Sequence, residues 1–153
     1  MRAFSPVPPW VWNAQNFRSL KSAEKLVFLY LITSPHQSSA GVARIPLAYA
    51  TADLQLPRGV FAGALVELRK AELIDFDADT DEIVILDWWR FNTPGNNAKW
   101  RAAIDKTHAG VISPRLRAVA VTGYRRGTGL SVLGDNNVTP LDALKTVRNK
   151  HNV

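Results

Sequence analysis

Five acidic side chains lie within nine residues of this sequence, in the segment DFDADTDEI from Asp75 to Ile83. Carboxylates at alternating positions can bind a cation, and the D-x-D-x-D spacing is similar to the start of an EF-hand calcium loop. Counting from Asp75, however, Thr80 stands where that loop needs glycine, and Leu86 stands where it needs glutamate. The spacing therefore disfavours calcium. Two other readings stay open: a solvated turn, or an edge that docks a basic partner such as the basic C-terminal half of another copy.

The rest of the 153-residue chain is basic, with a net charge of +6. Residues 73–87 hold six acids and no base, whereas residues 88–153 hold eleven Lys or Arg and three acids. A cationic surface attracts phosphate, so we expect DNA, duplex or single-stranded, as the partner. Plain solvation of these charges is the alternative. The bases that we expect to contact DNA are Arg58, Arg69, Lys70, Arg90, Lys99, Arg101, Lys106, Arg115, Arg117, Arg125 and Arg126.

The reason for this selection is the position of each base on a predicted helix. On the helix that begins at Pro57, Arg58 is the one outward base suited to reach a base edge, whereas Arg69 and Lys70 suit phosphate. Most of the others follow residue 95. There Trp100 and Tyr124 interleave with the bases, and such rings can stack on exposed nucleotides. Packing in the core is the favoured role for Trp100.

Catalytic and metal chemistry find little support in the sequence. There is no cysteine, the three histidines His36, His108 and His151 are far apart, and no HExxH motif is present. The segment GTGLSVLG lacks the third glycine of a dinucleotide fingerprint and the Lys-Ser/Thr of a P-loop. We therefore predict a protein that is not an enzyme and has no cofactor or metal. No apolar run approaches the length of a membrane span, so we expect a soluble cytoplasmic protein.

The elements that must position these groups follow from periodicity and capping residues. The predicted elements are a helix over 22–34 capped by Ser22, a short strand at VARI, helices over 47–53 and 57–71, and a β-hairpin of LIDF and EIVIL around DADTD. A helix over 96–110 and another starting at Pro114 with Ser113 as its cap would follow. The fold class expected is α+β, mainly helical: a winged helix-turn-helix with a small β-hairpin wing and extra C-terminal helices.

Four short motifs carry a resemblance to a known family: SLKSAEKLVFLYLITSPH, AGVARIP, LRKAELI and RFNTPGNN. Residues 12–101 resemble the N-terminal winged-helix domain of phage and prophage replication proteins, the DnaD-like replisome organisers. The resemblance implies DNA binding near a replication origin in a bacterial cell, and assembly with a helicase loader or another host protein. The sequence departs from the pattern at Glu72, where glycine is usual. It also has only about thirty residues after the domain, too few for the second helical domain of such proteins.

Three parts are predicted along the chain: an extended arm over 1–18, a winged-helix domain with its C-terminal helical extension over 19–123, and a flexible linker with a short amphipathic tail helix over 124–153. The leading hypothesis is a DNA-binding protein of phage replication initiation or replisome organisation. The alternatives are a protein-interaction adaptor or host-factor inhibitor on the same scaffold, and a phage transcriptional regulator. Homo-oligomer formation stays open.

Overall fold

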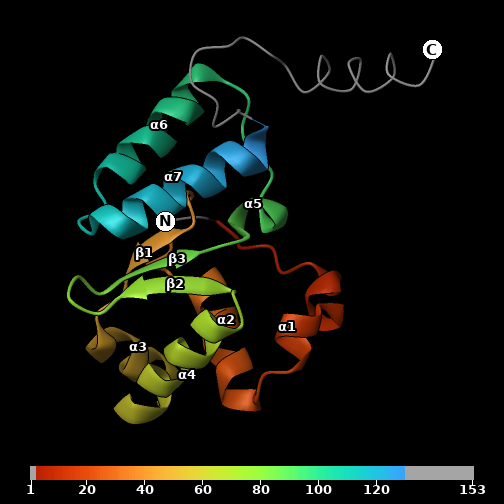
Figure 1. The fold of residues 1–153 in the computed structure, drawn as a ribbon, viewed down its shortest axis with the longest axis vertical. Coiled ribbons are helices and arrows are strands. Elements are labelled where there is room, and N and C mark those ends of the chain that lie inside the picture. Colours follow the sequence, from red (N-terminus) through yellow and green to blue (C-terminus); the bar gives the residue numbers. More distant parts are fainter. Residues whose placement is uncertain (1–2, 130–153) are drawn as a thin grey trace, which may run out of the picture.

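The computed structural model describes residues 3–129 as an α+β, mainly helical protein with a small antiparallel sheet between two sets of helices (Figure 1). No helix in this part of the chain is both long and apolar enough to cross a membrane. The elements in chain order are η1 (Pro9–Asn13), α1 (Gln15–Arg18), α2 (Ser22–Thr33), β1 (Val42–Arg44), α3 (Leu47–Leu54), α4 (Arg58–Lys70), β2 (Ile74–Asp77), β3 (Glu82–Ile85), α5 (Trp88–Phe91), α6 (Ala98–Ala109) and α7 (Pro114–Thr128).

The three-stranded sheet has the order β1-β3-β2, and β3 pairs antiparallel with both neighbours. Because side chains alternate between the faces of a strand, Ile83 and Ile85 enter the main core, whereas Val84 faces the other way. Val84 packs there with Val42 and with Leu116 of α7. Both faces of the central strand are therefore covered, and all four residues of β3 are buried.

The main core lies between the sheet and helices α2, α3 and α4 (Figure 1). Helix α2 lies deep because its sequence is apolar on nearly every side, and α4 presents Phe61, Ala64 and Leu68 on one buried face, as predicted. The predicted cap of α2 is wrong by one residue. Lys21 stands at the N-cap, and its backbone N–H donates to Glu24 Oε2 at 2.8 Å. The predicted order of helix, strand, helix, helix and hairpin is confirmed and is compatible with a winged helix.

The predicted extended arm is wrong after residue 8, because η1 and α1 are helical. Proline opposes a helix in its interior but is tolerated at the first helical position, which Pro9 occupies in η1. The arm packs on its own domain: Val11 and Phe17 are buried in the main core, and the ring of Trp10 lies 5.1 Å from that of Phe91. Burial of these side chains stabilises the local helices.

The predicted start of the linker at residue 124 is also wrong, because α7 continues to Thr128. The glycines that suggest a linker have another use here. A β-carbon at Gly127 would overlap the side chain of Trp89, so glycine lets α7 approach this ring closely. Tyr124 is buried at 5% exposure within the same contact. The predicted tail helix lies outside the described residues.

The end of α4 explains the departure at Glu72 from the resembled pattern. Glu72 adopts φ +57°, and the next backbone N–H, of Leu73, donates to the carbonyl of Leu68 at 3.1 Å. This closure of a helix end by a left-handed residue favours glycine, because a β-carbon costs about 1 kcal/mol there. We therefore expect Glu72→Gly to raise the free energy of unfolding by about 1 kcal/mol, measured by urea denaturation. Glu72→Ala keeps the β-carbon, so a gain of the same size in that variant would contradict this account.

Candidate nucleic-acid interface

The acids of the hairpin bind groups of the protein itself. Asp75 on β2 forms ion pairs with Arg69 of α4, at 3.1 Å, and with Arg115 of α7. Its side chain is only 16% exposed. Arg115 also donates to the carbonyl of Phe76 at 2.8 Å. One carboxylate therefore connects a helix on each side of the sheet.

Glu82 is the most deeply placed acid of the hairpin, with 4% exposure. Its carboxylate accepts the backbone N–H groups of Ile112 at 2.7 Å and Ser113 at 2.8 Å, just before α7 begins. The Thr80 hydroxyl lies 2.9 Å from Glu82 Oε2 and donates to it. Because backbone N–H groups at a helix start attract negative charge, this acid anchors the beginning of α7 on the sheet.

Asp77 and Ser113 complete the same contact. The Ser113 side chain accepts the N–H of Leu116 and so caps α7, as predicted. A hydrogen bond from Ser113, together with one from the backbone N–H of Asp79, holds the pKa of Asp77 below its usual range. We call this contact the hairpin–α7 junction; its members are Asp75, Asp77, Glu82, Ser113 and Arg115. Among residues 3–129 no three His, Asp or Glu side chains converge as a metal-binding group would.

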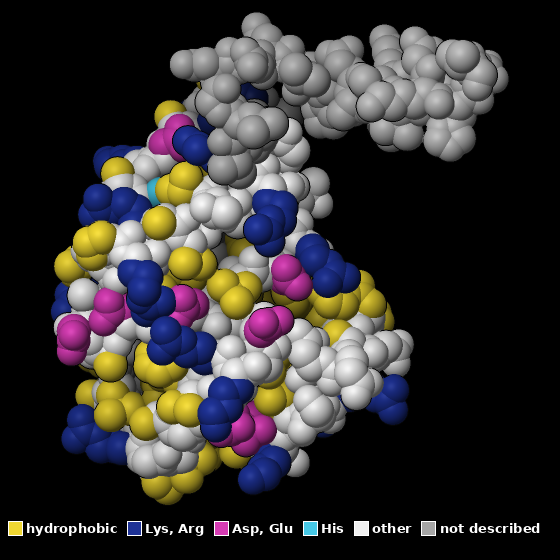
Figure 2. All heavy atoms as spheres, viewed as in Figure 1, with side chains coloured by type: hydrophobic (Ala, Val, Ile, Leu, Met, Phe, Trp, Pro, Cys, Tyr) yellow, Lys and Arg dark blue, Asp and Glu magenta, His cyan; other side chains and the backbone are white. Residues whose placement is uncertain are grey.

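Several bases predicted to contact DNA have partners within the protein. Besides Arg69 and Arg115, Arg117 donates twice to the Val111 carbonyl, at 3.0 and 2.6 Å. Lys70 pairs with Glu67 at 2.7 Å, and Arg90 pairs with Asp87 at 3.4 Å. Figure 2 shows basic and acidic side chains next to one another over the hairpin. These bases therefore present less free positive charge than their number suggests.

Helix α4 offers little to a nucleic acid besides Arg58. That side chain is exposed at the start of the helix and has no ion pair or hydrogen bond with another described residue. Further along, the exposed surface consists of small or apolar side chains, and β-carbons at Gly59 and Gly63 would meet open space. Such a surface lacks the Arg, Lys, Asn or Gln side chains that read base edges.

The predicted bases that stay free gather mainly on α6 and α7. Five of them have no ion pair or side-chain hydrogen bond to another described residue, namely Lys99, Arg101, Lys106, Arg125 and Arg126. Lys99 and Arg101 flank Trp100 in sequence, and the two arginines follow Tyr124. Because the Trp100 and Tyr124 rings are 6.1 Å apart, four of these bases lie around one aromatic contact. We call them the basic cluster: Lys99, Arg101, Arg125 and Arg126.

The rings beneath the basic cluster form a rigid support. Trp89 lies 5.6 Å from Trp100 and 5.2 Å from Tyr124, measured between ring centroids. Tyr124 is buried and Trp100 half-buried, so these rings pack against each other, in agreement with the favoured role for Trp100. Asn97 caps α6 by accepting the N–H of Trp100 at 2.8 Å, which fixes the helix start that carries Lys99.

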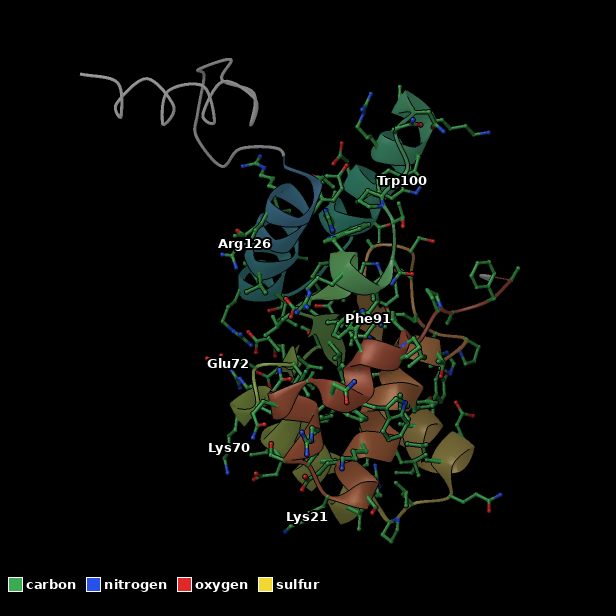
Figure 3. All side chains as sticks on the ribbon, turned by 90° about the vertical axis from the view of Figure 1, so that its right-hand side faces the viewer. Lys21, Lys70, Glu72, Phe91, Trp100 and Arg126 are labelled. Atoms are coloured by element: carbon green, nitrogen blue, oxygen red, sulfur yellow. The ribbon has the colours of Figure 1, made fainter. Side chains whose placement is uncertain are left out.

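One side of the basic cluster adjoins acidic groups. Figure 3 shows Arg126 on the same side of the molecule as Glu72 and Lys70. An open groove of about 600 Å³ lies here, lined by Arg126, Glu72 and Asp87 among others. Arg126 makes no ion pair with either acid within the described part of the chain. Because those carboxylates repel phosphate, we expect DNA to approach from the exposed surface of α6 and α7.

His108 connects α6 to the same aromatic contact. It is 3% exposed, its ring lies 5.7 Å from that of Tyr124, and its Nε2 has no hydrogen-bond partner among the described residues. Burial lowers the pKa of His108, although the nearby Asp105 opposes this shift. The unfolded chain therefore takes up a proton near the usual pKa of about 6.5, while the folded chain does not.

From this we expect the free energy of unfolding to be full above about pH 6.5 and to fall as the pH drops below it. Urea denaturation at pH 7.5 and 5.5 (chosen to be about one unit on either side of the usual pKa) measures the difference. His108→Phe fills the space without titrating, so it should reduce the difference. His36→Gln, at a partly exposed site, is the control. An undiminished difference in His108→Phe would contradict the assignment.

Comparisons of the chain with protein-family models, with curated proteins and with solved structures give no match.

The hairpin–α7 junction is what sequence reasoning missed. The prediction of Ser113 as a helix cap indicated where α7 begins, and free N–H groups at that point attract a carboxylate. Glu82, however, lies about thirty residues earlier in the chain, and no local pattern connects the two positions. The selection of Arg115 and Arg117 for DNA contact followed their charge, whereas their guanidinium groups bind Asp75 and the Val111 carbonyl.

Proposed function

We propose that the protein is a winged-helix DNA-binding protein that holds the phosphate backbone with the basic cluster on α6 and α7. The observation that carries this proposal is the gathering of Lys99, Arg101, Arg125 and Arg126 around one aromatic contact, without an ion-pair partner among the described residues. Unpaired bases on a rigid support bind phosphate with little loss of side-chain pairing. The order α2-β1-α3-α4-β2-β3 supports the winged-helix assignment.

The role that fits such binding is phage replication initiation or replisome organisation. The support for this role is the motif resemblance alone. A protein that assembles at an origin with other factors can bind DNA mainly through its backbone, because its partners supply part of the specificity. The bare surface of α4 agrees with weak sequence discrimination and disfavours a transcriptional regulator.

Binding to labelled DNA at low salt, followed by fluorescence anisotropy, tests the proposal. We expect the full chain to bind two duplexes of unrelated sequence with affinities that differ by less than about tenfold, because base-edge contacts are few. A single strand of the same length shows whether the cluster prefers either form. If neither duplex nor single-stranded DNA binds at low salt, the proposed function is wrong.

A protein-interaction adaptor is the second candidate, favoured by the exposed surface of α4. Gly59, Ala62 and Gly63 allow close approach by another protein, and Val66 beside them is 43% exposed. A pulldown from nuclease-treated bacterial lysate separates the two functions. A stoichiometric protein retained without DNA, combined with no DNA binding by the pure chain, would favour the adaptor.

A further inference from the structure

A groove between α4 and the hairpin is apolar inside and acidic at one end. Its volume is about 270 Å³, and its apolar lining includes Leu65 and Val66 of α4 with Phe76 and Ile83 of the hairpin. Its lining also includes Asp77, Asp81 and Glu82 but no lysine or arginine. We call it the α4–hairpin groove. Figure 2 shows hydrophobic side chains over α3 and α4, below the hairpin.

The shape and charge of the groove fit an amphipathic helix with basic side chains. Short helices dock in apolar grooves through side chains spaced three or four residues apart. The acids at the hairpin end would attract lysine or arginine next to those anchors. Arg44 alone brings a base near this end, where its Nε donates to the Thr80 carbonyl at 3.2 Å. The acids still outnumber it.

The chain itself contains a segment of this chemistry, outside the described residues. Residues 139–150 read TPLDALKTVRNK. Thr139 and Pro140 are suited to begin a helix, and Leu141, Leu144 and Val147 recur at helical spacing. The three bases of the segment are Lys145, Arg148 and Lys150. Its apolar side chains match the groove floor, and its bases match the acidic end.

The connection from α7 is long enough for docking within one molecule. Helix α7 begins beside the hairpin, where Arg115 contacts Phe76, and its fifteen residues extend roughly 22 Å from there. The ten residues from Gly129 to Val138 can span up to about 33–36 Å when extended. The segment can therefore return to the hairpin end of the groove of its own chain.

We propose that residues 139–150 dock in the α4–hairpin groove of the same chain. Docking buries Val66 and the apolar side chains of the segment, and it places the segment's bases beside the hairpin acids. This interaction goes beyond the proposed DNA binding and does not depend on it, because the basic cluster lies on other helices.

The absence of cysteine from the chain makes cross-linking a clean test. In the full chain, Ala62→Cys places a thiol in the groove, and Ala143→Cys places one beside the apolar anchors of the segment. The matched control joins Ala143→Cys with Ala102→Cys, an exposed alanine on α6. We expect the groove pair to form its disulfide at least about tenfold faster, because docking raises the local concentration of one thiol near the other.

A second variant tests the apolar anchors. Leu141→Ser with Leu144→Ser, added to the groove pair, should slow cross-linking to the rate of the control pair. Equal rates for the groove and control pairs would overturn the proposal, as would an unchanged rate in the serine variant. Disulfides that join two chains, seen as a dimer on a non-reducing gel, would also overturn docking within one chain.

Discussion

Glu82→Ala is expected to lower the free energy of unfolding by about 2–4 kcal/mol, because two backbone N–H groups lose their acceptor. Those groups belong to Ile112 and Ser113, and Ser113 is buried. The loss should reach α7 first, since Glu82 anchors the start of that helix on β3. Hydrogen exchange should then show faster opening of residues 114–128 than of α2.

Two variants make the Glu82 experiment specific. Asp79→Ala removes an acid from the same hairpin, but this side chain is exposed and has no hydrogen bond or ion pair with another described residue. We expect it to change stability by less than about 0.5 kcal/mol. Glu82→Gln keeps one carbonyl oxygen and should fall between the two, as measured by urea denaturation. Equal losses for Glu82→Ala and Asp79→Ala would mean that the junction contributes nothing beyond general charge.

Neutralising the basic cluster is expected to have the largest effect on DNA affinity. We expect the full chain with Lys99→Gln, Arg101→Gln, Arg125→Gln and Arg126→Gln to bind duplex about 60-fold more weakly at roughly 0.1 M salt if two phosphate contacts are lost. Each contact contributes about 0.9 logarithmic units of affinity at that concentration, through the release of counterions. Because these side chains are exposed, the unfolding free energy should stay nearly unchanged.

A matched pair on α4 serves as the control for affinity. Arg58→Gln with Lys70→Gln removes two exposed bases from the helix that would enter the major groove in an ordinary winged helix. We expect this pair to weaken binding by less than the corresponding pair Lys99→Gln with Arg125→Gln. The reverse order would move the binding surface from α6 and α7 to α4.

The local elements of this fold could be predicted from sequence, since each depends on nearby residues. The buried face of α4, with Phe61, Ala64 and Leu68, follows from helical spacing. The start of α7 follows from Ser113 and Pro114. The hairpin follows from two apolar runs around an acidic turn.

Other features depend on contacts that are distant in sequence. Gly127 has the composition of a linker, yet it lies within α7 because Trp89 occupies the space of its missing β-carbon. Pro9 indicates extended chain, yet it begins a helix whose neighbour Val11 is buried in the core. In both cases tertiary packing outweighs local preference.

The candidate site divides in the same way. Charge counting indicated correctly that the hairpin is acidic and that the residues after Trp88 are basic, but it could not show which charges neutralise each other. Asp75 removes Arg69 and Arg115 from the free bases, although the three residues lie on different elements. What stays free is the basic cluster, brought together by the contact between Trp100 and Tyr124.

The salt dependence of duplex binding tests this assignment most directly. A plot of the logarithm of the association constant against the logarithm of salt concentration should have a slope of about −1.8 to −3.6 for the unchanged chain, equivalent to two to four phosphate contacts. The variant without the four bases of the basic cluster should give a slope near zero. If that variant keeps the slope of the unchanged chain, the basic cluster is not where this protein holds DNA.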